Sequence, residues 1–409
     1  MLSNSILIKG GQYLTSTVDA NPFMIAGGFT SYGGATNSPR LISLNFDGTR
    51  TAFMSNFSPT ASALVETVNK IAIDDSGSVY AAGVFTRYQG ITANGIVKID
   101  KNGNTVTSFS TGSGFDVSLS HVDIMFYNYK LYVGGNFSTY NGLTANKLLR
   151  LNSDGSVDSS FNTGVGLSGS WVNTIAKNIS DDKIYVGGKF NNYNGTLQPG
   201  LIRLNTDGSL DTTFNSGATG FPITTTDINK ILVSSDGKLY VMGSFTHYNG
   251  TSFTSITGNN KMMRLNSDGS IDTSFVTKSF YGANDSILYA GSINSNGKIY
   301  VGGGFQTYDG TNVYSIVRLN SDGTKDTSFN TGTGLNIGFH TSAPDSAVIY
   351  DLFVDYADNI YVCGLWTSYS GTASKNLIKL KDSGSIDTTF VVRDILSNPV
   401  KSLNVNKLT

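Results

Sequence analysis

Short runs in which apolar and polar residues alternate recur along this chain, and a small polar turn follows each run. Examples are VNKIAID from Val68, VNTIAKN from Val172 and INKILVS from Ile228. An alternation with a period of two is typical of β-strands that have one buried face. The turns contain pairs such as Asp-Gly, because Asp bonds nearby backbone N–H groups and Gly accepts a positive φ. The pattern therefore predicts strands joined by tight turns.

A second strand phrase returns at nearly constant spacing, as LYVGGNF from Leu131, IYVGGKF from Ile184 and IYVGGGF from Ile299. It is followed by a Y-x-G turn, whose tyrosine stands at Tyr32, Tyr88, Tyr140, Tyr193, Tyr248, Tyr308 and Tyr369. The aromatic residue that closes the phrase D-T-S-F stands at Phe53, Phe109, Phe161, Phe214, Phe275, Phe329 and Phe390. Both markers indicate seven copies of one structural unit.

Each unit is expected to contain four short strands, of which the third reads LIRLN from Leu201 and the fourth reads IDTSF from Ile271. One such unit cannot bury both of its faces, so the units must stack on one another. The first unit lacks a first strand ahead of Phe23, and PVKSLNV from Pro399 resembles the missing strand. We therefore predict an all-β, seven-bladed β-propeller of four-stranded antiparallel blades over residues 23–409, closed by the C-terminal strand. Residues 1–22 are expected to be an N-terminal arm or attachment segment.

The phrases LNSDGSIDTSF from Leu265 and YVGGxFxxYNG resemble the delta-60 repeat, which occurs in β-propeller proteins of bacteria and phages. The resemblance covers residues from about 23 to 390, and it implies a propeller without implying an agreed chemistry. The first two units depart from the pattern, because LNFDGTRTAF and IDKNGNTVTSF lack the second Asp.

Glycine weakens the interior of a strand, so the Gly-Gly pair in the second strand needs an explanation. We expect the second strand to lie near the crowded centre of the ring, where the small residues let adjacent blades pack and the following Phe fills the space between them. Some units lack the first Gly of the pair. Ala81 and Ala82 stand in place of Val-Gly, and Met242 and Cys363 each replace the first Gly.

Composition narrows the classes of partner. The formal net charge of the 409 residues is -1 and only 14% are charged, so we expect no nucleic-acid partner. No stretch approaches the roughly 20 apolar residues that cross a bilayer, so no membrane insertion is expected. The N-terminus lacks a typical secretory signal, and incorporation into a virus particle is one alternative route out of a cell. The lone Cys363 cannot form an internal disulfide and is expected to be a small buried residue.

The Asp-rich turns offer two interpretations. The pairs Asp154/Asp158, Asp207/Asp211, Asp268/Asp272 and Asp322/Asp326 could supply oxygen ligands for calcium, but each turn has fewer carboxylates than a usual calcium loop. A hairpin turn stabilised by Asp side chains is the favoured alternative. The arginines at Arg150, Arg203, Arg264 and Arg318 share one repeat position, which favours structural pairing with a nearby Asp over a sialidase-like cluster.

No catalytic or metal site is predicted. The three histidines, His121, His247 and His340, stand in unrelated sequence settings, and no motif of metal ligands or phosphate-binding loop is present. We therefore expect a non-enzymatic protein without cofactor or metal. An enzyme of glycosidase or lyase type is a further alternative that rests on fold analogy alone.

Two insertions break the repeat: TSFTSITGNNK from Thr251, and the long segment after Phe329. Both connections are expected to emerge on one face of the ring, where variable loops on a rigid scaffold usually carry binding. Candidate binding residues are Tyr248, Phe253, Phe339 and His340, and the alternative is that these loops only pack on their neighbours. The first functional hypothesis is a phage virion component, a tail, fibre or head-decoration protein, that contacts other virion proteins and binds a host-surface glycan or protein. The second is a bacterial surface or exported adhesin.

Overall fold

The computed structural model describes residues 4–8, 12–16, 23–32, 40–53, 55–57, 66–117, 119–178, 180–223, 226–256, 260–282, 286–336, 347–355, 357–392 and 398–405. Every helix or strand assigned among these residues is a β-strand, which confirms the all-β prediction. In this part of the chain there is no helix with the length and apolar character that a membrane crossing requires.

Seven sheets in the described ranges share one strand order, in which a first strand pairs with a second and the second pairs with a third. We number them sheets 1 to 7 in the order of their second strands. The first strands are β36 (Val400–Val405), β5 (Thr67–Ile73), β10 (Val122–Tyr127), β15 (Leu167–Lys177), β19 (Asp227–Val233), β25 (Leu288–Ile293) and β31 (Val348–Val354). The second strands are β3 (Phe23–Gly27), β6 (Val79–Val84), β11 (Lys130–Gly135), β16 (Ile184–Tyr193), β20 (Leu239–Ser244), β26 (Ile299–Gly303) and β32 (Ile360–Leu365). The third strands are β4 (Leu41–Leu44), β9 (Ile96–Ile99), β14 (Leu148–Leu151), β18 (Leu201–Leu204), β23 (Asn260–Leu265), β29 (Ile316–Leu319) and β35 (Leu377–Leu380).

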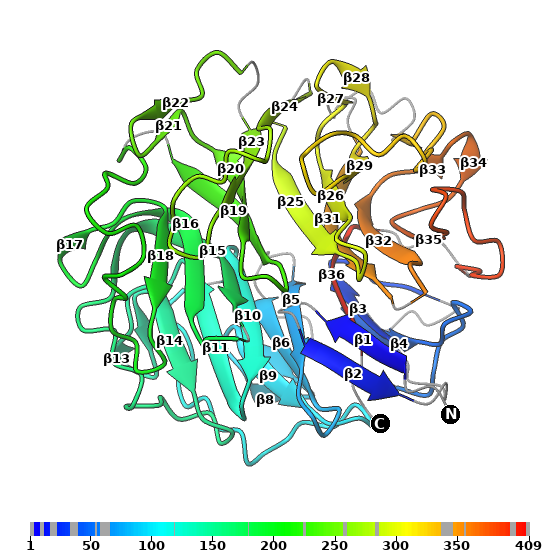
Figure 1. Ribbon diagram of the computed structural model, residues 1–409. Helices are drawn as coiled ribbons and strands as arrows, with labels where there is room; N and C mark the ends of the chain where they lie inside the picture. Colours follow the sequence, from blue (N-terminus) through cyan, green and yellow to red (C-terminus); the bar gives the residue numbers. More distant parts are fainter. Residues whose placement is uncertain are drawn as a thin grey trace.

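The sheets are arranged around a common centre (Figure 1). Residues from all seven first strands line a single central cavity, so the first strand is the innermost strand of each sheet. The prediction that the second strand lies nearest the centre is therefore wrong. The second strand lies one step further out, hydrogen-bonded between the first strand and the third.

The predicted fourth strand is not formed in the described residues. The segment after the third strand pairs through a single bridge, as between Leu204 and Leu210, and then turns. The N–H of Phe214 donates to the carbonyl oxygen of Asp211 at 3.3 Å, which closes this turn. The side chain of Asp211 is buried, and it accepts hydrogen bonds from Arg203 and from the N–H and hydroxyl of Thr213. The predicted fourth strand is therefore absent from the seven sheets in the described residues, and the four-stranded prediction is wrong at this segment. Sheet 5 instead gains β24 (Lys278–Tyr281), which pairs with β23.

The Y-N-G segments, expected to be loops, form small hairpins. Asn141 and Gly142 both have positive φ, 48° and 75°, which is the type I′ turn that suits a two-residue hairpin. The hydroxyl of Tyr140 donates to the carbonyl oxygen of Gly155 at 2.8 Å, which ties the hairpin to the turn after the third strand. The short strands of these hairpins are β7 (Arg87–Tyr88), β8 (Ile91–Thr92), β12 (Thr139–Tyr140), β13 (Leu143–Thr144), β17 (Thr196–Leu197), β21 (His247–Tyr248), β22 (Thr251–Ser252), β27 (Thr307–Tyr308), β28 (Thr311–Asn312), β33 (Ser368–Tyr369) and β34 (Thr372–Ala373).

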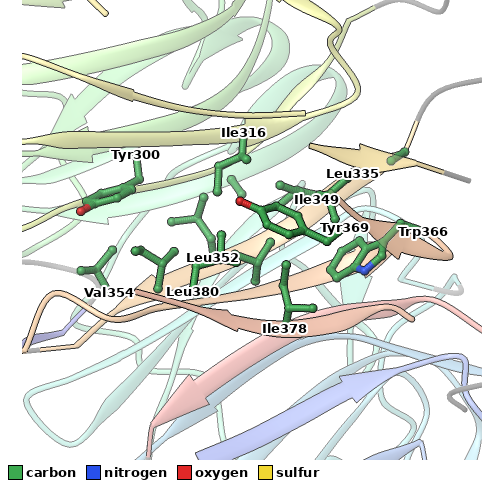
Figure 2. Close-up of a cluster of buried hydrophobic side chains, with 14 of the residues drawn as sticks. Tyr300, Ile316, Leu335, Ile349, Leu352, Val354, Trp366, Tyr369, Ile378 and Leu380 are labelled. Atoms are coloured by element: carbon green, nitrogen blue, oxygen red, sulfur yellow. The ribbon is translucent and has the colours of Figure 1, made fainter. Parts of the chain in front are cut away.

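The hydrophobic core lies between neighbouring sheets. In Figure 2, Tyr300 and Ile316 of sheet 6 face Ile349 and Leu352 of β31, and Trp366 lies at the far end of the same cluster. Similar clusters combine residues of consecutive sheets along the chain. The sheets therefore bury their faces against one another, as the repeat pattern predicts.

A cation–carboxylate pair stabilises the outer edge of sheet 4. Nε of Arg203 donates to Oδ2 of Asp211 at 2.8 Å, and Nζ of Lys183 lies 2.9 Å from the same oxygen. The guanidinium carbon of Arg203 lies 4.9 Å from the ring centroid of Phe214, the aromatic marker of the repeat. The same pair occurs as Arg150–Asp158, Arg264–Asp272 and Arg318–Asp326. The prediction that these arginines are structural is confirmed.

The remaining strands connect the ends and edges of the fold. The C-terminal strand β36 pairs with β3 in the register Phe23–Val405 to Gly27–Val400, as predicted from the repeat. Within the predicted N-terminal arm, β1 (Asn4–Ile8) pairs with β2 (Gln12–Ser16) as an antiparallel hairpin. The strands β24 (Lys278–Tyr281) and β30 (Leu335–Asn336) add to the hairpins of β27 and β33.

Candidate binding mouth of the central channel

A β-bulge interrupts the first strand of six sheets. At this point one residue of the first strand has no partner in the second strand, and a bulge of this kind re-aims the side chain of the extra residue. The extra residues are Asn69, Asn173, Asn229, Tyr289, Tyr350 and Lys401, which we name the belt. Five of them are the second or third residue of their first strand, and Asn173 lies further along the longer strand β15.

The second glycine of each Gly-Gly phrase makes room for this bulge. A Cβ atom on Gly188 would come within 3.0 Å of the carbonyl oxygen of Trp171 and of Cα of Val172, and backbone cannot move aside cheaply. This position is glycine in all seven sheets: Gly27, Gly83, Gly135, Gly188, Gly243, Gly303 and Gly364. In sheet 3, whose first strand has no register shift, the atom nearest to a Cβ on Gly135 is the carbonyl oxygen of His121, the residue before β10.

The first glycine has a different role. A Cβ atom on Gly187 would meet the side chains of Ile228 and Ile231, which belong to the first strand of the next sheet. Side chains can adjust, so this position also holds Ala82, Met242 and Cys363, all buried. The prediction that the phrase allows adjacent sheets to pack is confirmed for the first glycine, and Cys363 is the small buried residue that was expected. The role of the second glycine was not predicted.

Neighbouring belt residues contact one another. The ring centroids of Tyr289 and Tyr350 lie 5.4 Å apart, and Nζ of Lys401 lies 3.3 Å from the ring centroid of Tyr350. Nδ2 of Asn173 donates to the carbonyl oxygen of Ile228 at 3.2 Å. All six belt side chains retain exposure, and Tyr289 is 38% exposed. The belt therefore presents aromatic, amide and ammonium groups at the mouth of the channel.

A second aromatic group extends the belt over sheets 3 to 5. The rings of His121 and Trp171 stack with centroids 4.2 Å apart, and Nζ of Lys189 lies 5.4 Å from the Trp171 ring. Oδ1 of Asp227 accepts a hydrogen bond from Asn173 at 2.7 Å. Burial raises the pKa of Asp227, although the charge of Lys189 and the hydrogen bonds oppose the shift. Burial also lowers the pKa of His121.

Beneath the belt, the residues opposite the first glycine position form an inner circle, which we name the axial ring. Its members are Lys70, Asp123, Thr174, Lys230, Ala290, Asp351 and Ser402. Nζ of Lys70 lies 3.0 Å from Oδ2 of Asp351 and 3.9 Å from Oδ1 of Asp123. Since β36 lies between β5 and β31, the Lys70–Asp351 pair reaches past a sheet (Figure 1). The side chains of Lys70, Asp123 and Asp351 therefore meet near the common centre, where all three line the central cavity.

On the other side of the axial ring lies a cavity of about 110 Å³. Its walls are the C-terminal halves of the first strands, with apolar residues such as Ile73, Met125, Val233 and Phe353. The described residues contain no group of three or more His, Cys, Asp or Glu side chains with the geometry of a metal site. The channel thus has a polar, aromatic mouth and an apolar opposite end.

Two of the candidate binding residues from the sequence, Tyr248 and Phe253, do not lie at this mouth. Tyr248 is buried, and its hydroxyl donates to the carbonyl oxygen of Gly269 at 2.7 Å. Phe253 is also buried, with its ring centroid 5.5 Å from that of Phe245. Phe339 and His340 lie outside the described residues. Tyr248 is the same packing tyrosine that every repeat carries, which repeat position alone could have indicated; a binding role for this loop stays a prediction.

Solved structures provide fold comparisons at low sequence identity. The extracellular domain of BT4673 from B. thetaiotaomicron aligns with a TM-score of 0.45 and 13% identity over 92% of this chain, and this chain covers 39% of that one. PorZ, a surface component of the type-IX secretion system of Porphyromonas gingivalis, aligns with a TM-score of 0.43 and 14% identity. The alignment covers 90% of this chain and 49% of PorZ. The Dos1 propeller aligns with a TM-score of 0.46 and 14% identity, over 93% of this chain and 82% of the Dos1 chain. A search of curated protein sequences finds no significant match.

One family model matches the chain, the "Domain of unknown function (DUF5122) beta-propeller". It matches six segments: residues 75–109, 130–161, 179–214, 234–275, 294–329 and 357–390. Each segment runs from the turn after a first strand to the aromatic marker of the same repeat. Together they cover more than half of the 409 residues, and the chain therefore belongs to this β-propeller repeat family.

Proposed function

We propose that the seven sheets are the blades of one closed ring. The pairing of β36 with β3 joins the two ends of the chain within sheet 1. A second contact supports closure: the N–H of Val391, in sheet 7, donates to the carbonyl oxygen of Asp47, in sheet 1, at 2.8 Å. The same bond joins other consecutive sheets, as from Asn162 to Asp207 and from Asn215 to Asp268. Sheets 7 and 1 are thus connected in the same way as neighbours elsewhere.

We further propose that this ring is a non-catalytic module that binds a surface glycan at the belt. The observation that carries the proposal is the belt itself, in which six consecutive bulges turn tyrosine, asparagine and lysine side chains toward one mouth. Tyrosine offers an apolar face together with a polar tip, and amides both donate and accept hydrogen bonds. This combination suits sugar rings, which have apolar C–H faces and hydroxyl edges.

The state of the acidic groups near the centre supports a non-catalytic role. Oδ2 of Asp351 is paired with Lys70 and lies 3.3 Å from Oγ of Ser402. Oδ2 of Asp123 accepts a hydrogen bond from the N–H of Ile175 at 2.8 Å. These carboxylates are committed to structural partners, whereas a general acid or base needs access to a reacting group.

The carrier of this module is proposed to be a phage particle, in which the propeller is a tail, fibre or head-decoration component and the belt meets the host surface. The basis of this proposal is the resemblance to the delta-60 repeat, which occurs in phage and in bacterial proteins. The same resemblance therefore supports a bacterial surface adhesin equally well. Immunogold labelling separates the two candidates: labelled virions favour the first, and labelled cell envelopes without labelled virions favour the second.

An array of bacterial surface polysaccharides, probed with the purified full-length protein, tests the binding proposal. Saturable binding to one or a few glycan classes is expected, with dissociation constants in the micromolar range typical of exposed, partly solvated sites. The absence of saturable binding across the array, together with capture of a purified host-surface protein, would contradict a glycan ligand.

A further inference from the structure

Lys401 is the one cationic residue among the six belt residues. It is the bulge residue of β36, so the C-terminal strand carries it to the mouth beside Tyr350 of sheet 7. Its ammonium lies 3.3 Å from the Tyr350 ring centroid. Among the residues that the structure describes, no carboxylate lies within 4.0 Å of this ammonium. Two other partly buried lysines differ, since Lys70 pairs with Asp351 and Lys98 pairs with Asp74.

Partial burial of the Lys401 ammonium without a nearby carboxylate is energetically unfavourable. Removing a cation from water is unfavourable unless a counter-charge or hydrogen bonds compensate, and a tyrosine ring compensates only in part. Burial accordingly lowers the pKa of Lys401 to about 8, although Cys363 opposes the shift. An anion that arrived at the mouth would supply the missing counter-charge and would meet little competition from the described carboxylates. Lys401 is therefore suited to an external anionic partner.

The groups around Lys401 narrow the chemistry of that partner. Tyr289 lies next to Tyr350 and remains 38% exposed, so a flat, partly apolar ring can rest on it. The amides of Asn173 and Asn229 continue the belt over the neighbouring sheets. A single small anion would use only the ammonium, whereas a sugar that bears a carboxylate would use the ammonium and the tyrosine face together.

We propose that the belt binds an acidic polysaccharide segment, in which a uronate carboxylate pairs with the ammonium of Lys401 and a sugar ring packs on Tyr289. This inference rests on the proposed glycan-binding function and specifies its ligand class. A carboxylate that pairs with a partly desolvated ammonium forms a charge-assisted hydrogen bond, which is stronger than a bond between neutral groups. Lys401 thus discriminates acidic from neutral glycans, and the aromatic and amide groups give affinity for sugar rings in general.

Calorimetric titration with two matched probes tests the inference: an oligogalacturonate, and the same oligomer with its carboxylates methyl-esterified. The full-length wild-type protein is expected to bind the acid at least about tenfold more tightly than the ester. Lys401→Met is expected to abolish this preference, and Lys401→Arg to retain part of it. Thermal unfolding of each variant checks the fold, and Lys401→Met is expected to be at least as stable as the wild type because it removes an unpaired buried charge.

The possible failures are distinguishable. Equal binding of acid and ester by the wild-type protein would overturn the role of Lys401 and leave a glycan-binding function intact. Full acid preference in Lys401→Met would also overturn it. Binding of neither probe would overturn the uronate proposal, and the glycan array then decides whether the glycan-binding function fails with it. Binding of polyglutamate but not of oligogalacturonate would overturn the inference in favour of an acidic peptide.

Discussion

Gly188 lies directly against the backbone carbonyl of Trp171, at the point where the first strand of sheet 4 carries the extra residue Asn173. The same relationship recurs around the fold, with a glycine in every second strand and a bulge in six first strands. A bulge turns one more side chain toward the channel mouth than a regular strand would. The repeated glycine is therefore linked to the surface that we propose as the binding site.

The two glycines of one phrase should differ in their tolerance of a side chain. We expect Gly188→Ala to destabilise the protein by about 1–3 kcal/mol, because the new Cβ atom collides with backbone that cannot repack locally. Gly187→Ala is the matched control and should cost less than Gly188→Ala, because the atoms nearest to its Cβ belong to the side chains of Ile228, Thr174 and Ile231. Urea unfolding of the two variants measures the difference. Equal destabilisation would show that the bulge does not determine the second position.

Acid should weaken the outer edges of the sheets. Burial alone would raise the pKa of Asp211, but hydrogen bonds from Thr213 and Lys183 and the charge of Arg203 lower it well below its usual range. The folded pKa lies below the unfolded value of about 3.9, so the unfolded state binds more protons as the pH falls through this region. The stabilisation is therefore present above about pH 4 and is lost below it. Asp387 behaves in the same way, with its pKa lowered to about 2.

The variant Asp211→Asn tests this pair. It should cost about 1–3 kcal/mol at pH 7, because Arg203 and Lys183 lose their counter-charge. The difference in unfolding free energy from the wild type should shrink as the pH falls below about 4. Denaturant unfolding at several pH values measures it. A difference that stays constant down to pH 2 would contradict the assignment.

Alkali should weaken the packing of the hairpins. Burial raises the pKa of the hairpin tyrosines Tyr140, Tyr193, Tyr308 and Tyr369 far above 10. These groups stay protonated in the folded state and ionise near pH 10 in the unfolded state, so their stabilisation is complete below about pH 10 and decreases above it. The buried tyrosines should ionise only together with unfolding. Ionisation of all 21 tyrosines before any loss of far-ultraviolet circular dichroism would contradict this burial.

Loss of the C-terminal strand should disrupt the fold. Truncation before residue 398 removes β36 and leaves β3 as an unpaired edge strand, which promotes unfolding and aggregation. We expect the cooperative thermal transition to disappear or to shift to a markedly lower temperature. Truncation after Val405 is the control and should leave the transition in place. An unchanged transition in the shorter protein would contradict the proposed ring closure.

Much of the architecture follows from the repeat. The phrases that contain Tyr185 and Phe214 recur at fixed positions, and they predict the strand units, the packing between units and the pairing of β36 with β3. The arginine–aspartate pairs were also predictable, since Arg203 and Asp211 hold constant places in four repeats. The chain belongs to a β-propeller repeat family, and the resemblance to the delta-60 repeat likewise implied a β-propeller.

The mouth could not be predicted in the same way. The belt residues differ in type, from Asn173 to Tyr289 to Lys401, and a bulge becomes visible only when the first and second strands are placed in register. The sequence analysis instead favoured residues near the insertions, and Tyr248 and Phe253 are buried packing groups.

The central claim, that the belt is the binding surface, is tested most directly with two tyrosines, one in the belt and one outside it. Tyr289 belongs to the belt and is 38% exposed, whereas Tyr281 lies on β24, which pairs with β23 and β27, and is 57% exposed. The affinity of the wild type and of each Tyr→Ala variant is measured for the glycan that binds best on the array. We expect Tyr289→Ala to weaken binding at least about tenfold and Tyr281→Ala to leave it unchanged. A loss in Tyr281→Ala with normal binding by Tyr289→Ala would contradict the claim.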